Sequence, residues 1–132
     1  MGNGIAHVAA LSGFRVNLID LNKDALDSAI NKINDNLDRQ IQKDKITSSE
    51  KIEAMGNIAL SIDINDCRNS DLVIEAVPEV LSLKTKLFSE IDSFIKKDAI
   101  LASNTSSISI SDLAGSTNRA DRVIGMHFMN PV

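Results

Sequence analysis

Residues 100–107 read ILASNTSS and residues 123–131 read VIGMHFMNP, and these two stretches decide the fold. Each begins as a short apolar run, which is typical of a buried strand, and then turns polar. In an open parallel sheet, ligands bind outside the carboxyl ends of the strands. Two neighbouring strands of this kind would place a hydroxyl, an amide and an imidazole in one crevice. Such groups can together move a proton on an alcohol or a carbonyl.

The rest of the chain alternates predicted helices with predicted strands. The apolar spacing predicts helices over 2–11, 22–41, from 48 onward, 80–95 and 108–114, and strands over 15–20, 57–61, 70–77, 98–102 and 122–126. The helix over 80–95 is expected to turn its apolar face inward through Leu83, Leu87, Phe88, Ile91 and Ile95. This alternation predicts βαβ units, a parallel sheet and therefore an α/β fold.

Length and composition narrow the class of protein. A chain of 132 residues is expected to form one domain at most, and its net charge of −4 has no basic face, which argues against a nucleic-acid partner. No apolar run reaches the roughly 18 residues of a membrane span, and no signal segment opens the chain. The single cysteine, Cys67, excludes an internal disulfide and a cysteine metal cluster, so no metal site is expected. A reducing compartment, the cytoplasm, fits best.

The first 20 residues match half of a dinucleotide-binding pattern. Gly2 and Gly4 open a helix, and the strand after it ends in Asp20. Glycines would let a pyrophosphate approach the amino end of the helix, and the acid would receive the adenosine ribose hydroxyls, which favours NAD over NADP. The full Gly-x-Gly-x-x-Gly is absent. A glycine-capped helix and a solvated strand end therefore remain alternative interpretations.

Four stretches together carry a family resemblance. Residues 1–6 (MGNGIA), 71–77 (DLVIEAV), 102–110 (ASNTSSISI) and 125–131 (GMHFMNP) resemble the NAD-binding domain of the 3-hydroxyacyl-CoA dehydrogenases, including the 3-hydroxybutyryl-CoA dehydrogenases. The likeness covers essentially the whole chain. It implies a Rossmann-type, doubly wound, mostly parallel sheet that lacks the family's first strand. Residues 1–132 would then be a partial NAD-binding domain without the helical C-terminal domain that binds substrate and makes the dimer.

The resemblance also implies catalytic roles. His127 matches the family's general base, which takes the hydroxyl proton while hydride leaves C3 of the substrate for the nicotinamide. Ser106 matches the serine that hydrogen-bonds the substrate oxygen near the nicotinamide, and Asn130 an asparagine near the cofactor and the active site. The family's glutamate that holds the other ring nitrogen of the histidine falls after Val132.

Binding roles follow from the same resemblance. The expected contacts to NAD are made by Gly2, Asp20, Glu79 and Lys84, together with Ser106 and Asn130. The expected contacts to coenzyme A are made by Asn36, Lys43 and Ser106. A solvated side chain is the alternative for Lys43, a packing role for His7, and a structural role for Glu75, which lies inside its strand.

The expected function is therefore that of a fragment of an NAD-dependent 3-hydroxyacyl-CoA dehydrogenase. The complete protein would oxidise a (3S)-hydroxyacyl-CoA to the 3-oxoacyl-CoA, or catalyse the reverse, in fatty-acid or butanoate metabolism, as a homodimer without a membrane partner. The isolated fragment is expected to be inactive. One alternative is an inactive dinucleotide-binding remnant or interaction module. Another is a hydroxy-acid or sugar-acid dehydrogenase on the same sheet, although those usually use a lysine in place of this histidine.

Overall fold

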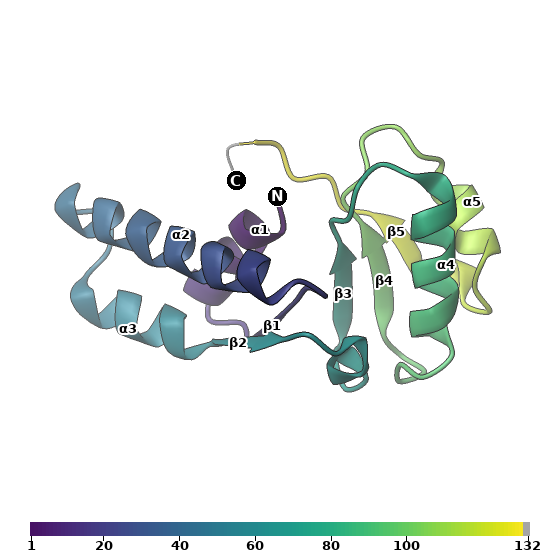
Figure 1. Cartoon of the computed structure of the whole chain (residues 1–132), viewed down its shortest axis with the longest axis horizontal. Helices are drawn as coiled ribbons and strands as arrows, with labels where there is room; N and C mark the ends of the chain where they lie inside the picture. The colour runs from purple at the N-terminus through teal and green to yellow at the C-terminus, as the bar shows by residue number, and fades with distance from the viewer. Residues whose placement is uncertain (131–132) are drawn as a thin grey trace. The chain divides into compact units, whose positions relative to one another are not determined.

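The computed structural model describes residues 1–130, in which α-helices and short strands are interspersed along the chain (Figure 1). The helices are α1 (Gly2–Leu11), α2 (Lys23–Gln42), α3 (Ser48–Gly56), α4 (Leu81–Asp92) and α5 (Ile110–Gly115), with single 3-10 turns at Ile64–Cys67 and Ala120–Arg122. The strands are β1 (Val16–Ile19), β2 (Ile58–Ser61), β3 (Leu72–Glu75), β4 (Ile100–Ser103) and β5 (Val123–Gly125). Every strand pair in the described residues is parallel, which confirms the predicted α/β class.

The chain divides into two compact units. The first contains residues 1–64 and Asn130. In it β1 pairs with β2, and α1 packs against β1, α2 and α3. Apolar side chains from the three helices form its core, namely Ala6, Ala10, Ile33, Leu37 and Ala54. Side chains satisfy the free amides at two helix starts: Asn22 caps α2, and Thr47 forms a capping box with Glu50 on α3.

The second unit contains residues 65–129 and a sheet of order β3-β4-β5. Ser103, at the end of β4, lies opposite Glu75 of β3 and Gly125 of β5. Because the strands are parallel and in this register, the segments that follow them leave the sheet at one edge. Helices α4 and α5 contact each other, and α5 packs on β5. A Cβ atom at Gly125 would lie 3.2 Å from the side chain of Ile110, so this glycine permits the close approach of α5.

A clamp made by one arginine fixes the chain between α4 and β4. The guanidinium of Arg119 pairs with Asp92 at the end of α4. It also donates to backbone carbonyls of the segment that follows α4, those of Ile95, Lys96, Lys97 and Ala99. The side chains of Arg119 and Asp92 are only 11% and 6% exposed, so this is a largely buried ion pair.

The buried face of α4 differs from the prediction at one position. Leu83, which was expected to face inward, is 42% exposed, and that prediction is wrong. Lys84 is buried instead, with an exposed fraction of 1%, in line with Phe88 and Ile91, four and seven residues further along the helix. A lysine tolerates this position because the carboxylates of Glu75 and Glu79 pair with its ammonium group.

Candidate functional site

The carboxyl edge of the β3-β4-β5 sheet brings two predicted site loops together. The amide of Phe128 donates to Asn104 Oδ1 at 2.6 Å, which joins the loop after β4 to the loop after β5. The first of these loops carries Ser106 and the second carries His127. Both side chains are exposed, and neither has a hydrogen-bond or ion-pair partner within residues 1–130. A free hydroxyl and a free imidazole thus follow adjacent strands.

A closed network of hydrogen bonds and ion pairs, here called the polar ring, supports the first of these loops. It consists of Glu75, Glu79, Lys84, Ser103 and Thr105. Lys84 Nζ donates to both carboxylate oxygens of Glu75, at 2.9 and 3.0 Å, and lies 2.7 Å from Glu79 Oε1. Thr105 Oγ1 donates to Glu79 Oε2 at 2.6 Å, and the amide of Thr105 donates to Ser103 Oγ at 3.2 Å. Ser103 Oγ in turn donates to Glu75 Oε2 at 2.6 Å, which closes the ring.

The charges in the polar ring compensate one another. The side chains of Glu75 and Lys84 are 0% and 1% exposed, and buried charges of this kind persist only when they are paired and hydrogen-bonded. Three carboxylate oxygens receive the three ammonium protons of Lys84, so no donor remains for another group. Hydrogen bonds from Lys84 and then from Thr105 lower the pKa of Glu79 to about 2. Glu79, whose side chain is 42% exposed, is therefore a permanent anion at the rim of this edge.

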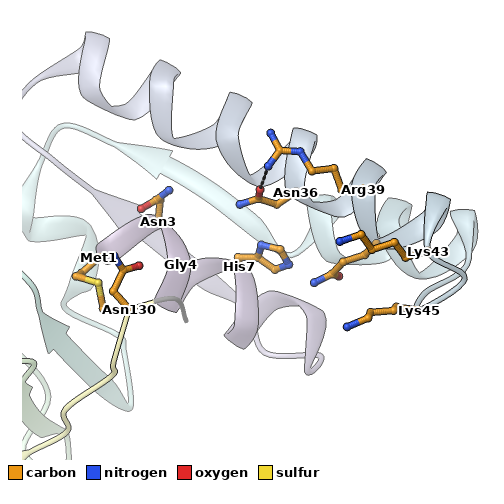
Figure 2. A pocket seen from close by; sticks show the side chains of 10 residues that line it. Met1, Asn3, Gly4, His7, Asn36, Arg39, Lys43, Lys45 and Asn130 are labelled. Carbon is orange, nitrogen blue, oxygen red and sulfur yellow. Dashed lines mark hydrogen bonds between the residues drawn. The ribbon is translucent and has the colours of Figure 1, made fainter.

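The first unit contains a separate cavity of about 390 Å³, shown in Figure 2. Residues near the start of α1 line one wall, and residues of α2 and the turn after it line the other. The lining residues are Met1, Asn3, Gly4, His7, Asn36, Arg39, Gln40, Lys43, Lys45 and Asn130. None of these residues is acidic, and three are cationic, so the cavity favours an anionic ligand.

The turn at the end of α2 explains why two lysines reach this cavity. Asp44 has φ +53°, a left-handed conformation that Asp tolerates better than most residues. The amide of Lys45 donates to Gln40 O and the amide of Asp44 to Ile41 O, both at 2.9 Å, which is a Schellman motif. This turn reverses the chain, so that Lys43 and Lys45 both line the cavity (Figure 2).

Polar groups on the cavity walls are only partly satisfied. Arg39 donates to Asn36 Oδ1 at 3.2 Å, the contact drawn in Figure 2. Gln40 Oε1 is buried close to His7, and it makes no hydrogen bond of ordinary geometry within residues 1–130. His7 is buried on α1, and burial lowers its pKa, so its imidazole is neutral at neutral pH. The cavity therefore offers an amide acceptor and a neutral imidazole beside its cations.

The two remaining cofactor candidates also lie in the first unit. Gly2 is the first residue of α1, and Asp20 directly follows β1. Asp20 Oδ1 accepts the amide of Asn22 at 2.8 Å, which orients the exposed carboxylate at the start of α2. The structure thus groups Glu79 and Lys84 with the loops of Ser106 and His127 in one unit. It places Asn36, Lys43 and Asn130 around the cavity of the other.

Sequence reasoning missed several of these residues. Arg39 and Lys45 line the cavity with Lys43, and their spacing of four and two residues from Lys43 was an available signal. Within the polar ring, Ser103 and Thr105 were not assigned a role. Glu75 is the one charged residue of an otherwise apolar strand, and Lys84 interrupts the apolar stripe of a helix, which together could have indicated a buried pair.

The described residues contain neither a cluster of metal ligands nor a membrane-spanning helix. No group of three or more His, Cys, Asp or Glu side chains within residues 1–130 is placed to hold a metal ion. Over the same range, none of the helices combines the length and the apolar character that crossing a membrane requires.

Comparison with known proteins identifies the family. The family model described as "3-hydroxyacyl-CoA dehydrogenase, NAD binding domain" matches residues 1–132. The chain belongs to this family. Within it, the chain is 49% identical to the 3-hydroxybutyryl-CoA dehydrogenase of Bradyrhizobium diazoefficiens, over 100% of this chain and 45% of that protein. It is also 37% identical to the fatty acid oxidation complex subunit alpha of Pseudomonas entomophila, over 100% of this chain and 18% of that subunit.

The solved structures of 3-hydroxyacyl-CoA dehydrogenases confirm the fold. The (S)-3-hydroxybutyryl-CoA dehydrogenase of Ralstonia eutropha aligns with a TM-score of 0.96 and 45% identity, over 100% of this chain and 47% of that one. The predicted Rossmann-type arrangement of parallel strands and helices is therefore confirmed. The chain spans about half the length of the 3-hydroxybutyryl-CoA dehydrogenases that it matches.

Proposed function

We propose that the protein to which this chain belongs is an NAD-dependent 3-hydroxyacyl-CoA dehydrogenase. It oxidises a (3S)-hydroxyacyl-CoA to the 3-oxoacyl-CoA, or catalyses the reverse, and residues 1–132 form part of its NAD-binding domain. The observation that carries the proposal is the joining of the Ser106 and His127 loops, through Asn104 and Phe128, at the carboxyl edge of a parallel sheet. Family membership supports the cofactor and the reaction class.

The reaction needs a base and a hydrogen-bond donor at the substrate oxygen. In the oxidation, His127 accepts the hydroxyl proton of the substrate alcohol. Bound NAD would accept the hydride that leaves C3, so that the C3–O bond would become a carbonyl and the cofactor would be reduced to NADH. Ser106 donates a hydrogen bond to the substrate oxygen and stabilises the charge that develops there, and Asn130 lies near the cofactor. The exposure of Ser106 and His127, and their lack of partners within residues 1–130, support these roles.

The first unit contributes Gly2 and Asp20 to the proposed NAD binding. Gly2 lies at the amino end of α1, where free amides favour the pyrophosphate, and the carboxylate of Asp20 receives the adenosine ribose hydroxyls. A carboxylate there also repels a 2′-phosphate, which favours NAD over NADP. Glu79 is ionised at neutral pH and still partly exposed, so it can accept a hydrogen bond from the cofactor. Lys84 contributes through Glu79, because its own donors are occupied.

Coenzyme A binding is assigned to the cavity of the first unit. Asn36 and Lys43 line it, together with Arg39 and Lys45. Three cations, with no carboxylate among the lining residues, suit the phosphate groups of coenzyme A. This assignment rests on family resemblance and on the charge of the cavity. Cytoplasmic location, a homodimeric complete protein and the absence of nucleic-acid or membrane partners remain predictions.

The test uses the protein expressed from its complete reading frame, with acetoacetyl-CoA as the substrate. The absorbance of NADH measures the rate. We expect turnover, a fall of roughly 10²- to 10⁴-fold in kcat for His127→Gln, and a smaller fall for Ser106→Ala. Ser89→Ala, at an exposed serine of α4, is the matched control and should behave as the wild type. Wild-type activity in His127→Gln would exclude the assigned base.

The same assay separates the proposal from the alternative of an inactive remnant. A complete reading frame that yields no turnover with any 3-hydroxyacyl-CoA or 3-oxoacyl-CoA would support the remnant. The 132-residue chain alone is expected to show little or no activity, and turnover equal to that of the complete protein would show that these residues suffice.

A further inference from the structure

The loop that the polar ring supports contains one serine, Ser106, whose side chain is not hydrogen-bonded to the ring. Thr105 and Ser107 flank Ser106 in the sequence, and the side chains of both donate to Glu79 Oε2, at 2.6 and 2.9 Å. Thr105 Oγ1 also accepts the amides of Ser107 and Ile108, at 3.3 and 2.9 Å. Ser106 is exposed, and its hydroxyl makes no such contact within residues 1–130.

The other half of the ring anchors this loop to the sheet. Glu75 accepts the amide of Val77 at 2.6 Å and the hydroxyl of Ser103, and its backbone carbonyl accepts the amide of Asn104 at 2.8 Å. The buried carboxylate at the end of β3 therefore holds the point where β4 becomes the loop. Lys84 neutralises this carboxylate and also holds Glu79, so one ammonium group connects both ends of the loop.

We propose that the polar ring is a positioning device for Ser106. Glu75, Lys84, Ser103 and Thr105 act as positioning residues that fix the backbone on both sides of this serine and leave its hydroxyl free for the substrate oxygen. The proposal rests on the function proposed above and extends it to three residues, Glu75, Ser103 and Thr105, that have no assigned role there. It also assigns the buried Lys84 a role in which its ammonium group does not contact the cofactor.

The chemistry of the site explains why such a device is useful. A hydrogen bond to a developing negative charge accelerates the reaction most when the donor is already in place. A misplacement of about 1 Å, even one caused far from the reacting atoms, can lower the rate about a hundredfold. A serine in a loop has no regular ladder of hydrogen bonds to hold it. The ring supplies these bonds from buried side chains.

The test compares two substitutions at Thr105 in the complete protein. Thr105→Val keeps the shape and removes the hydroxyl, whereas Thr105→Ser keeps the hydroxyl. We expect Thr105→Val to lower kcat by between about tenfold and about a hundredfold, with the KM for the acyl-CoA changed less than about twofold. Thr105→Ser should stay within about threefold of the wild-type kcat. An unchanged kcat in Thr105→Val, or an equal fall in both variants, would overturn the proposal.

A second readout does not depend on turnover. The amides of Ser107 and Ile108 lose their acceptor in Thr105→Val, so their hydrogen exchange should accelerate about tenfold or more, but not in Thr105→Ser. Unaltered exchange in Thr105→Val would also contradict the ring's hold on the loop. If the wild-type complete protein turns over no 3-hydroxyacyl-CoA, the proposed function fails, and the exchange rates still decide whether the ring orders the loop.

A double variant separates positioning from simple stabilisation. Glu75→Leu combined with Lys84→Met replaces the buried ion pair with apolar side chains, a change that stability often tolerates. We expect unfolding at a denaturant midpoint close to that of the wild type, and a kcat still lowered about tenfold or more. Asp71→Asn is the matched control and should keep full activity. Asp71 forms an exposed ion pair with Lys96, just before β3 and after α4, at the ends of these elements that face away from the polar ring in sequence. Full activity in the stable double variant would show that the ring is only structural.

Discussion

Glu79 has a carboxylate that stays ionised far below neutral pH. Hydrogen bonds from Lys84 and Thr105 lower its pKa to about 2. Because the folded-state pKa lies below the unfolded one, the interaction stabilises the fold above about pH 4.5, and this stabilisation is lost as the pH falls toward 2. A carbon-detected NMR titration should give a midpoint near 2 for Glu79 in the wild type. Removing one donor with Ser107→Ala should raise the midpoint, and an unshifted midpoint would contradict this cause.

His7 should make the stability of the fold depend on pH closer to neutrality than Glu79 does. Burial lowers its pKa from the usual 6.5, so the unfolded chain takes up a proton before the folded one does. The free energy of unfolding should therefore fall as the pH drops through about 6.5, and level off below the folded-state pKa. Urea unfolding between pH 7.5 and 5 should show this slope in the wild type and less of it in His7→Gln. Parallel curves for the two proteins would contradict the prediction.

Single residues show where sequence reasoning stops. The pattern of α4 predicted Leu83 inside, because apolar residues are usually buried and lysines exposed. The structure has the opposite arrangement at Leu83 and Lys84, because the partner carboxylate of Glu75 comes from a strand nine residues earlier. Propensity and periodicity describe neighbours on one element. They do not reveal a pair that forms only when a strand and a helix pack together.

At the scale of elements, Arg119 holds the end of α4. Its guanidinium pairs with the nearly buried Asp92 and donates to carbonyls of the segment between α4 and β4. Arg119→Ala removes the ion-pair partner of Asp92, which keeps only its hydrogen bonds from Asn118, and removes a donor from these carbonyls. We therefore expect a loss of roughly 3 to 5 kcal/mol in the free energy of unfolding. Arg122→Ala removes a pair with Asp98 whose side chains are 41% and 87% exposed, and should change stability by less than about 1 kcal/mol.

Urea unfolding followed by circular dichroism measures both variants. A loss in Arg119→Ala no larger than in Arg122→Ala would show that burial does not distinguish these two ion pairs.

The helices and strands were predicted well because their signals are local. Helix α1 begins at Gly2 and strand β1 at Val16, close to the expected positions. Apolar spacing marks such boundaries, and so do capping residues such as Asn22 before α2 and Thr47 before α3. The 3-10 turns at Ile64–Cys67 and Ala120–Arg122 were missed, because a single turn shows no periodicity. The loops of Ser106 and His127 could be paired from strand order alone, whereas the bond between Asn104 and Phe128 could not.

At the scale of the whole molecule, the chain divides into two compact units, which we expect to open with different free energies. Leu37 lies in the first unit and Leu113 in the second, and each is 0% exposed. Leu37→Ala should lower the unfolding free energy of the first unit by about 2 to 5 kcal/mol and should affect the second less. Leu113→Ala should do the reverse. Native-state hydrogen exchange of both variants measures this, and equal losses in both units would show a single cooperative unit.

The burial of Lys84 has a practical consequence for chemical labelling. Reagents that methylate primary amines need access to the lysine nitrogen, and in the folded chain this nitrogen is enclosed by two carboxylates. Exposed lysines such as Lys23 and Lys96 should react readily, whereas Lys84 should stay unmodified until its unit opens. The methylated fraction of a single peptide, read by mass spectrometry, would then count molecules that have lost native packing around this amine.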